Sequence, residues 1–426
     1  MIRTVENSEV RRREVLREMR IRAEDVGREI NETAAAIMED VRLRGFVAVS
    51  EYSQKYDGST PYELTEEDIS LHSNKCSPEL YRAMERAAEN IWDYQSHLLP
   101  TGSSWSVGVS STLGQTIRGM NRVGLYVPGG KAAYPSTVLM TAVPAKVAGV
   151  RELTMVTPPT ENLNAAVFAA AKIVGVDRII AIGGVQAVGA LTYGAGFIPK
   201  VDKIVGPGNA YVTAAKRMAY GKIDIDMIAG PSEVLIIADE SANPEYLAAD
   251  LMSQAEHDPL SSAILVTTSQ AVAEETTVAI ERQIQSLARR EIIEQSFRDF
   301  GAIIMCGSLE EAAEIANDVA PEHLEIVTRN PEQVAELTRN AGAIFLGEYS
   351  PEPLGDYMAG PSHVLPTSGT ARFFSPLSVD SFVKKTSIIK YSKEDLEAVG
   401  RDTITFAQSE GLTAHAASIK TRLEKK

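Results

Sequence analysis

Four histidines stand beside other side chains that can bind a metal or move a proton. In one segment, Gln254 and His257 are three residues apart at the end of a predicted helix, close enough to share a ligand. A neutral imidazole and an amide oxygen can both bind zinc. A hydrogen bond within the core is a commoner explanation of such a pair. The segments are SQAEHDP (253–259), APEHLEI (320–326), GPSH (360–363) and GLTAH (411–415).

Two further positions could complete a metal site. Asp356 is predicted to lie in a glycine-flanked loop that could present its carboxylate to a cation, although an Asx turn would use it equally well. His415 follows a predicted helix boundary at Gly411, with Glu410 directly before that glycine. Two imidazoles, an amide and a carboxylate would suit zinc if the fold brings all four together.

The segment APEHLEI places Glu322 and His323 where a loop is predicted to enter a strand. A carboxylate and an imidazole at such a position could transfer protons, one by activating water and the other by taking a proton from the substrate. A surface glutamate beside a partly buried histidine would give the same pattern.

Three glycine-rich turns are predicted to meet at one edge of a parallel sheet, because each follows a β-branched run and precedes a helical stretch. Free N–H groups at helix starts favour anions such as nucleotide phosphates there, although turns also use glycine for tight geometry alone. The dinucleotide fingerprint is absent, since Gly206 and Gly208 lead to Tyr211. Asp224 and Asp226 are only weak candidates for a ribose carboxylate. The turns are YVPGGKAAYPSTV (126–138), IGGVQAVGAL (182–191) and VGPGNAYVTAAKR (205–217).

The wider pattern predicts an α/β fold with two Rossmann-like lobes built on parallel sheets. Residues 1–121 show helical apolar spacing and are predicted to pack on the second lobe. β-Branched runs alternate with Ala-rich helices through 122–235, the first lobe, and 236–378, the second. The second lobe ends in a long loop rich in Pro, Gly and Ser at 348–378. Residues 379–426 are predicted to form a helical tail.

Composition narrows the classes of function. The chain has 426 residues, which favours more than one domain, and 44% hydrophobic and 23% charged residues, which are globular values. No apolar run approaches the roughly 20 residues of a membrane span, and the N-terminus lacks the apolar core of a secretory signal. A net charge of −15 argues against nucleic acid or anionic membranes as partners. Two cysteines are too few for a disulfide framework, so we expect a cytoplasmic protein.

Together these segments resemble the histidinol dehydrogenase family, in family order over about 120–416, and the helical N-terminus also fits. The resemblance implies two incomplete Rossmann-like lobes that bind NAD unconventionally, which agrees with the missing fingerprint. It also implies an interwoven homodimer in which the tail completes the partner's site. The matching segments are RVGLYVPGG, IGGVQAVGAL, VGPGNAYVTAAKR, DMIAGPSEVLIIAD, DLMSQAEHDP, APEHLEI, EYSPEPLGDYMAGPSHVLPTSGTAR and EGLTAHAAS.

The same resemblance implies roles for matched residues. One zinc ion per subunit would be held by Gln254, His257, Asp356 and His415. The acid–base pair would be Glu322 and His323. NAD would contact Tyr126, Gln186 and Asn209. The substrate, L-histidinol, would contact Ser232, Gln254, His257, His323, Asp356, Glu410 and His415. His363 matches a family position without an assigned role.

The implied reaction oxidises L-histidinol to L-histidine through an aldehyde, in two steps with two NAD⁺, at the end of histidine biosynthesis. Zinc would position the substrate, His323 would take the hydroxyl proton, and Glu322 would activate water to hydrate the aldehyde. Cys306 lies in an apolar strand and Cys76 in no recognised motif. We therefore expect both thiols to be inert, with water as the nucleophile.

Three other functions are compatible with these residues. A relative with the same fold and metal could act on another alcohol or diol, but a carboxylate at Glu410 suits a cationic amino alcohol. A zinc hydrolase could use Glu322 as a base, but it would leave the three glycine turns without a purpose. A non-catalytic regulator that binds nucleotide or metal would produce no NADH.

Overall fold

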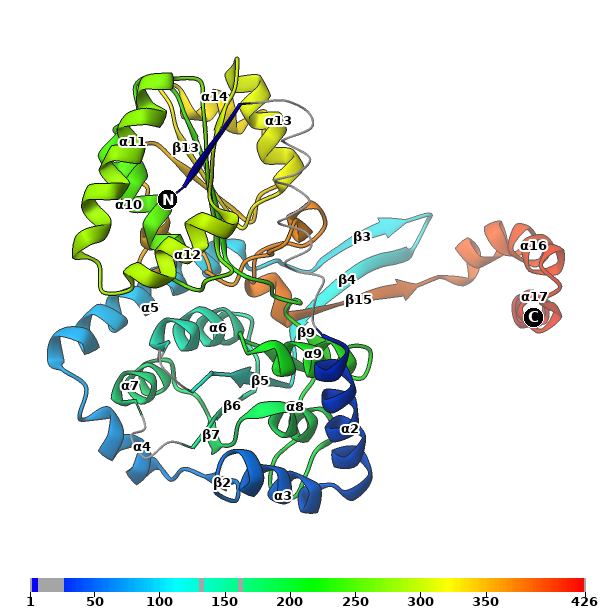
Figure 1. The fold of residues 1–426 in the computed structure, drawn as a ribbon. Helices are drawn as coiled ribbons and strands as arrows, with labels where there is room; N and C mark the ends of the chain where they lie inside the picture. The colour runs from blue at the N-terminus through cyan, green and yellow to red at the C-terminus, as the bar shows by residue number, and fades with distance from the viewer. Residues whose placement is uncertain (1, 7–26, 130–133, 160–163, 425–426) are drawn as a thin grey trace.

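The computed structural model describes residues 2–6, 27–129, 134–159 and 164–424. Two lobes are each built around a six-stranded sheet, and a separate three-stranded sheet forms an arm that projects away from them (Figure 1). The expected α/β class with parallel sheets is confirmed. None of the helices in the described ranges combines the length and the apolar character that a membrane crossing requires.

The first lobe has the strand order β2-β7-β6-β5-β8-β9, in which only β2 runs antiparallel. Its central strands are buried along almost their whole length, because helices cover both faces of a parallel sheet. The strands are β2 (Tyr62–Glu63), β5 (Arg122–Tyr126), β6 (Glu152–Thr157), β7 (Arg178–Ala181), β8 (Lys203–Val205) and β9 (Asp224–Ile225), and the helices are α6 (Pro135–Val147), α7 (Ala165–Val174), α8 (Gly184–Tyr193) and α9 (Ala210–Ala219).

The N-terminal helices pack mainly on this first lobe, so the expectation that they pack on the second lobe was wrong. Helix α2 contacts α8 and α9, α3 contacts α8, and α4 and α5 contact α7. The apolar stripe of α2 includes Val41, which packs closely on α8 because Gly189 has no side chain there. Among the described N-terminal residues, only the short strand β1 joins the second sheet, beside β12. The elements are β1 (Arg3–Glu6), α2 (Arg28–Arg44), α3 (Phe46–Tyr56), α4 (Glu66–Ser73) and α5 (Pro78–Leu98).

The second lobe has the fully parallel order β1-β12-β11-β10-β13-β14. Strand β10 crosses the expected lobe boundary between residues 235 and 236, yet all of it belongs to this sheet, so the boundary precedes Glu233. The further elements are β10 (Glu233–Ala238), α10 (Pro244–Ala255), β11 (Ser262–Thr267), α11 (Gln270–Gln283), η1 (Ile284–Ser286), α12 (Arg290–Phe300), β12 (Ala302–Met305), α13 (Leu309–Val319), β13 (His323–Val327), α14 (Pro331–Ala335), β14 (Ala343–Leu346), α15 (Glu352–Tyr357), η2 (Thr370–Arg372) and η3 (Val379–Phe382).

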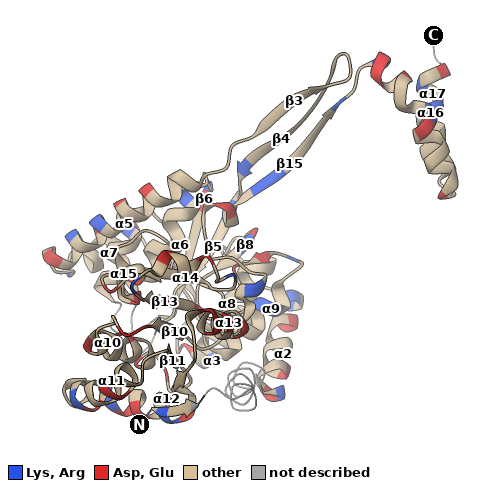
Figure 2. Cartoon of the chain, turned by 90° about the horizontal axis from the view of Figure 1, so that it is seen from above, with Lys and Arg blue, Asp and Glu red and all other residues tan. Residues whose placement is uncertain are grey.

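The arm is an antiparallel sheet in the order β15-β4-β3, with two tail helices at its outer end. Both views place these tail helices well away from the lobes (Figures 1 and 2). The expectation of purely helical terminal regions was therefore wrong where these strands lie. Large apolar side chains on the arm and tail are exposed in the single chain, among them Trp105, Ile389 and Phe406. The elements are β3 (Ser103–Val107), β4 (Ser111–Gly119), β15 (Val383–Lys390), α16 (Lys393–Ser409) and α17 (Thr413–Glu424).

Candidate active site

Helix α10 carries Gln254 into the core of the second lobe. The side chain of Asn243 caps the helix by accepting a hydrogen bond from the N–H of Glu245, and Leu247 and Leu251 are fully buried along one face. Gln254 lies on that face and is 1% exposed. Neither polar atom of its amide has a hydrogen-bond partner among the described residues. The core hydrogen bond that would have explained this residue is therefore not present in the described structure.

His257 lies just beyond α10, which ends at Ala255, so the expectation that both residues sit on the helix was wrong for His257. The chain turns there, and the N–H of His257 donates to the carbonyl oxygen of Gln254 at 3.2 Å. Burial lowers the pKa of His257. The imidazole is therefore neutral near pH 7, the form that binds metals.

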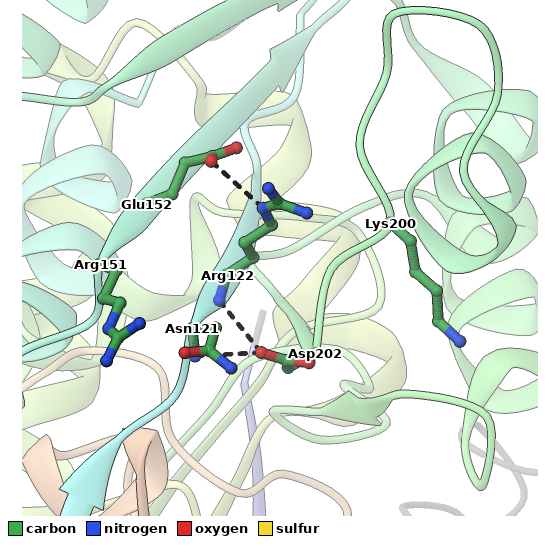
Figure 3. A pocket seen from close by; sticks show the side chains of 6 residues that line it. All are labelled: Asn121, Arg122, Arg151, Glu152, Lys200 and Asp202. Atoms are coloured by element: carbon green, nitrogen blue, oxygen red, sulfur yellow. Dashed lines mark hydrogen bonds and ion pairs between the residues drawn. The ribbon is translucent and has the colours of Figure 1, made fainter.

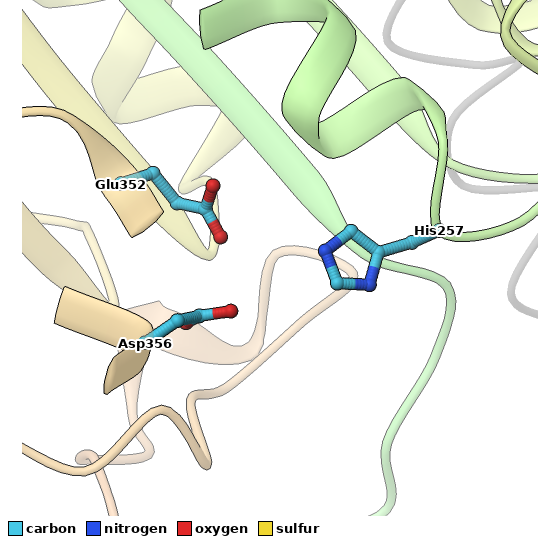
Figure 4. Close-up of side chains that lie close together, drawn as sticks. All are labelled: His257, Glu352 and Asp356. Atoms are coloured by element: carbon cyan, nitrogen blue, oxygen red, sulfur yellow. The ribbon is translucent and has the colours of Figure 1, made fainter. Parts of the chain in front are cut away.

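Asp356 approaches His257 from the short helix α15, where the sequence had predicted a loop. His257, Glu352 and Asp356 each offer one ligand atom, and these atoms lie within 4.8 Å of one another (Figure 4). The sequence analysis missed Glu352. It stands four residues before Asp356, a spacing that places two side chains on one helix face, so recognition of α15 would have revealed it.

Buried carboxylates fix these elements to one another. The hydroxyl of Ser253 on α10 donates to Glu352 Oε2 at 3.1 Å, and the N–H of Glu352 donates to Glu325 Oε1 on β13 at 2.8 Å. Burial raises the pKa of Glu352 to about 8 and that of Asp356 to about 6. Buried acids this close to one another and to an imidazole fit a cation that would compensate their charge.

Glu322 and His323 lie where β13 begins, as the sequence predicted, and both are buried. His323 Nδ1 is 3.0 Å from the carbonyl oxygen of Glu233, which can only accept, so this nitrogen carries the proton. Nε2 has no hydrogen-bond partner among the described residues and lies 3.9 Å from Asp356 Oδ1. Burial lowers the pKa of His323 to about 3. Nε2 is therefore an unprotonated base that faces the proposed metal ligands.

Glu322 Oε2 accepts a hydrogen bond from the N–H of Glu233 at 3.0 Å and lies 3.7 Å from His323 Nδ1. Burial raises its pKa well above the usual range, and the carboxylates of Glu233, Asp356 and Glu352 add to this shift. Glu322 is therefore held close to Asp356 and Glu352 in an environment that favours proton uptake.

A cavity of about 330 Å³ opens beside this pair, and its lining includes His323, Asp356 and His363. Burial lowers the pKa of His363 to about 4, so this imidazole is also neutral. Ser232 directly precedes β10, and its carbonyl oxygen accepts from the N–H of Ser262. The next residue, Glu233, contacts both Glu322 and His323, so Ser232 lies at the rim of the same region.

The three glycine turns lie at the carboxyl ends of β5, β7 and β8 in the first lobe. The hydroxyl of Tyr126 accepts from the N–H of Gly184 at 3.0 Å and so joins the first turn to the second. The amide of Gln186 donates to Asp57 at 3.2 Å, and Asn209 caps α9. Residues 130–133 of the first turn lie outside the described residues.

Both weak candidates for a ribose carboxylate pair with lysine side chains of the first lobe. Asp224 accepts from Lys203 Nζ at 2.9 Å. Asp226 forms a buried ion pair with Lys216 and accepts from the N–H of Gly206 at 2.7 Å. Lys216 Nζ also donates to the carbonyl oxygen of Gly206 at 2.8 Å. This ion pair thus holds both backbone polar groups of Gly206, its N–H and its carbonyl oxygen.

Glu410 and His415 are not brought to the cluster within one chain. Glu410 ends α16 and His415 lies in the first turn of α17, at the outer end of the arm (Figure 1). Gly411, with φ of +73°, makes the turn between the helices. Both side chains line a groove of about 580 Å³ on the tail, beside Phe406 and Leu412. The single chain therefore divides the predicted ligands between two distant places.

A comparison with known protein families shows to which family this chain belongs. Residues 20–423 match the family model described as histidinol dehydrogenase. The chain belongs to the histidinol dehydrogenase family. Histidinol dehydrogenase from Clostridium acetobutylicum is 52% identical over 400 residues, which cover 93% of each protein. That from Heliobacterium mobile is 51% identical over 397 residues, which cover 92% of this chain and 93% of the relative.

Membership of the family also accounts for the fold. The crystal structure of histidinol dehydrogenase from Elizabethkingia anophelis aligns with a TM-score of 0.94 and 36% identity, covering 99% of this chain and 98% of that one. Such coverage includes the arm and the tail as well as both lobes. This member of the histidinol dehydrogenase family thus shares the arrangement of its relative from end to end.

A second cavity, of about 610 Å³, lies at the opposite edge of the first sheet, at the amino ends of its strands (Figure 3). Arg122 there pairs with Glu152 at 3.1 Å, and Asp202 accepts from the backbone N–H groups of Asn121 and Arg122. These contacts join the starts of neighbouring strands. The charged residues that line the cavity thus have a structural role, and the cavity lies away from the glycine turns.

Both cysteines lack the character of a nucleophile. Burial raises the pKa of Cys306 to about 11 and raises the pKa of Cys76 as well. A thiol rather than a thiolate is therefore present near pH 7 at both positions. This supports the expectation that water, not cysteine, attacks an aldehyde in this family member.

Proposed function

We propose that this chain is a zinc-dependent, NAD-linked oxidoreductase that converts L-histidinol to L-histidine through an aldehyde, as the last steps of histidine biosynthesis. The observations that carry this proposal are the buried amide of Gln254, which has no hydrogen-bond partner among the described residues, and the convergence of His257, Glu352 and Asp356. A member of the histidinol dehydrogenase family with that donor set has the ligands that zinc requires. We expect the enzyme to work in the cytoplasm.

The donor chemistry fits one zinc ion per subunit. Gln254, His257 and Asp356 would supply an amide oxygen, an imidazole nitrogen and a carboxylate oxygen from this chain, and His415 of a second copy would supply another nitrogen. A bound zinc ion would act as a charged template for the amine and the imidazole of the substrate. It would also compensate the charge of the buried carboxylates, whose pKa values are raised by burial.

His323 would act as the base for the alcohol. Its Nδ1 proton is directed to the carbonyl oxygen of Glu233, and the lone pair on Nε2 faces the zinc ligands and the cavity. This orientation lets Nε2 accept the hydroxyl proton while NAD⁺ accepts the hydride. Since the ring is already neutral, no other proton has to leave it first.

Glu322 would act in the second half of the reaction. It lies 3.7 Å from His323 and is hydrogen-bonded to the N–H of Glu233, which fixes its position. Its raised pKa matches a group that takes a proton from water near pH 7, once a neighbouring cation lowers the local negative charge. The hydrated aldehyde would then give a second hydride to a second NAD⁺ and a hydroxyl proton to a neighbouring base, and so form the acid.

NAD would bind at the glycine turns of the first lobe. Tyr126, Gln186 and Asn209 each lie on a different turn at one edge of the sheet, where ligands of parallel sheets bind. Glu410 and His415 would reach the site of a partner subunit in a homodimer. The exposed apolar side chains along the arm support such an assembly, because a single chain would leave them in water.

An absorbance assay at the NADH band tests the proposal directly. We expect NADH production from L-histidinol and NAD⁺, its loss after chelation, and its return when zinc is added. His257→Asn should lower zinc content and turnover together. Production with an unrelated amino alcohol or diol but not with L-histidinol would refute the substrate, and full activity without metal would refute the zinc site.

A further inference from the structure

Asp395 joins the tip of the arm to the tail helices. Its carboxylate accepts hydrogen bonds from the backbone N–H groups of Val109, Ser110 and Ser111 in the β3–β4 turn, at 2.7, 3.0 and 2.9 Å. The hydroxyls of Ser111 and Ser392 add contacts at 2.6 and 3.0 Å. The side chain of Asp395, in the first turn of α16, thus accepts hydrogen bonds from a turn that lies almost 300 residues earlier in the chain.

The surroundings of Asp395 are built for a carboxylate. A Cβ at Gly108, where φ is +62°, would collide with it, so the turn that presents these N–H groups requires glycine there. Ser111 Oγ also accepts from the N–H of Ser392, and Ser392 caps α16. The hydrogen bond from Ser111, with those from the turn, holds the pKa of Asp395 well below its usual range. The group is therefore ionised at any working pH.

This junction sets the direction of the tail. The chain leaves β15 at Lys390 and enters α16 at Lys393, and two such connecting residues would otherwise leave the helix free to swing. Helix α17 follows α16 rigidly, because Gly400 lets Leu423 and Ile419 pack closely against it. The orientation of Glu410 and His415 relative to the arm is thus fixed at Asp395.

We propose that Asp395 is a positioning residue for the active site of the partner subunit. It holds the tail helices at the angle at which His415 reaches the partner's metal ligands and Glu410 reaches the partner's substrate. The inference rests on the proposed function, in which these two residues complete the second site. It adds a residue that touches neither metal nor substrate and acts through the rigid tail.

Asp395→Asn replaces one acceptor oxygen by a donor that faces backbone N–H groups, and should loosen the junction. We expect zinc affinity to fall by about 10–100-fold, as when other residues that orient metal ligands are lost. The KM for L-histidinol should rise, while the affinity for NAD, whose proposed contacts all come from the first lobe, stays unchanged. Glu394→Gln is the matched control, because it removes one negative charge from the same turn of α16 at an exposed position.

Ser111→Ala is a gentler variant that keeps the fold, since it removes only one hydroxyl from the junction. It should shift zinc affinity in the same direction by a smaller factor. Zinc affinity equal to that of the unaltered enzyme in both Asp395→Asn and Ser111→Ala, in dimers of unchanged size, would overturn the proposal.

Heterodimers show which subunit's active site loses activity when Asp395 is replaced. When Glu322→Gln is on one chain and Asp395→Asn on the other, the only competent lobe receives an unaltered tail, so activity per competent site should be normal. When both changes are on one chain opposite an unaltered chain, the competent lobe receives the loosened tail and should be impaired. Equal activity in the two arrangements would overturn the positioning role.

The same pair of heterodimers with His415→Asn in place of Asp395→Asn tests the shared site itself. A difference between arrangements for His415→Asn but not for Asp395→Asn would reject the role of Asp395 and leave the proposed function intact. No difference for either variant would instead reject the shared sites on which the proposal rests.

Discussion

At the scale of single residues, the most informative feature is a polar group that the fold leaves unsatisfied. The amide of Gln254 gives up its hydrogen bonds to water and gains none from the described part of the protein. An unsatisfied buried group of this kind costs roughly 1–3 kcal/mol. A helix face otherwise lined by Leu247 and Leu251 would be more stable with a third leucine, which supports the proposal that the amide binds a ligand.

Gln254→Leu should therefore have opposite effects with and without zinc. The metal-free protein should gain up to about 1–3 kcal/mol of unfolding free energy, because the unsatisfied amide is removed. Zinc affinity should fall about tenfold or more, because a ligand is lost. Thermal unfolding with chelator and with zinc measures both effects.

Gln95→Leu is the matched control for this experiment. Gln95 is equally buried, but its Oε1 accepts from the N–H of Val379 at 2.8 Å. Its replacement should destabilise the protein with or without metal. A loss of stability in metal-free Gln254→Leu similar to that of Gln95→Leu would show that the amide of Gln254 has a structural partner.

Glu352 gives the metal-free protein a characteristic dependence on pH. Because its folded-state pKa is raised to about 8, the folded chain binds a proton that the unfolded chain has released. This stabilisation is complete below the unfolded pKa and is lost as pH rises toward 8. The lowered pKa values of His257, His323 and His363 act oppositely, but only below about pH 6.5.

The unfolding free energy of the metal-free protein should therefore fall between pH 6.5 and pH 8, by up to about 1.4 kcal/mol per pH unit for this one group. Glu352→Gln should reduce that slope, since the amide does not titrate. Denaturant unfolding at several pH values measures it. An unchanged slope in the variant would assign the dependence to other groups.

At the scale of elements, the sequence predicted best what depends on local pattern. The β-branched runs of both lobes became strands, and Asn243-Pro244 began a helix as expected. The arm was missed because strands such as Ser111–Gly119 are polar and half-exposed, with neither regular alternation nor a buried apolar run. Helix α15 was missed because Pro353 and Gly355 within six residues indicate a loop. The convergence of His257 with Asp356 depends on tertiary packing, which no local pattern records.

The third glycine turn depends on a buried ion pair that the sequence analysis did not predict. Asp226 was a weak candidate for ribose recognition, yet it pairs with Lys216 inside the lobe. Asp226→Asn should destabilise the protein by about 3–5 kcal/mol, because it leaves a buried ammonium without its counter-ion. It should also weaken NAD binding by releasing Gly206.

The double variant Asp226→Leu with Lys216→Met should recover most of the stability without restoring NAD affinity. Unfolding experiments and NAD titration can measure these two effects.

At the scale of the whole molecule, the ligands predicted for one metal site lie in two separate places within the chain. His257 and Asp356 converge in the second lobe, while Glu410 and His415 belong to the tail, whose helices lie at the outer end of the arm (Figure 1). Two large apolar side chains, Ile389 on the arm and Phe406 on the tail, are 73% and 70% exposed. A second copy would both cover these side chains and receive the tail, so the proposed dimer would be part of the site rather than an addition to it.

Complementation between two inactive chains tests this arrangement. Glu322→Gln removes the proposed base for water, and His415→Asn removes a proposed ligand from the tail, so each homodimer should have little activity. In the mixed dimer, the lobe of the His415→Asn chain receives an unaltered tail from the Glu322→Gln chain. One of its two sites is then complete, and turnover should approach half that of the unaltered dimer. Mass spectrometry should establish the proportion of heterodimer, and a mixture of the same chains kept as homodimers is the control. Absence of recovery in proven heterodimers would mean that each chain completes its own site, which the extended tail could do only by folding back across the arm.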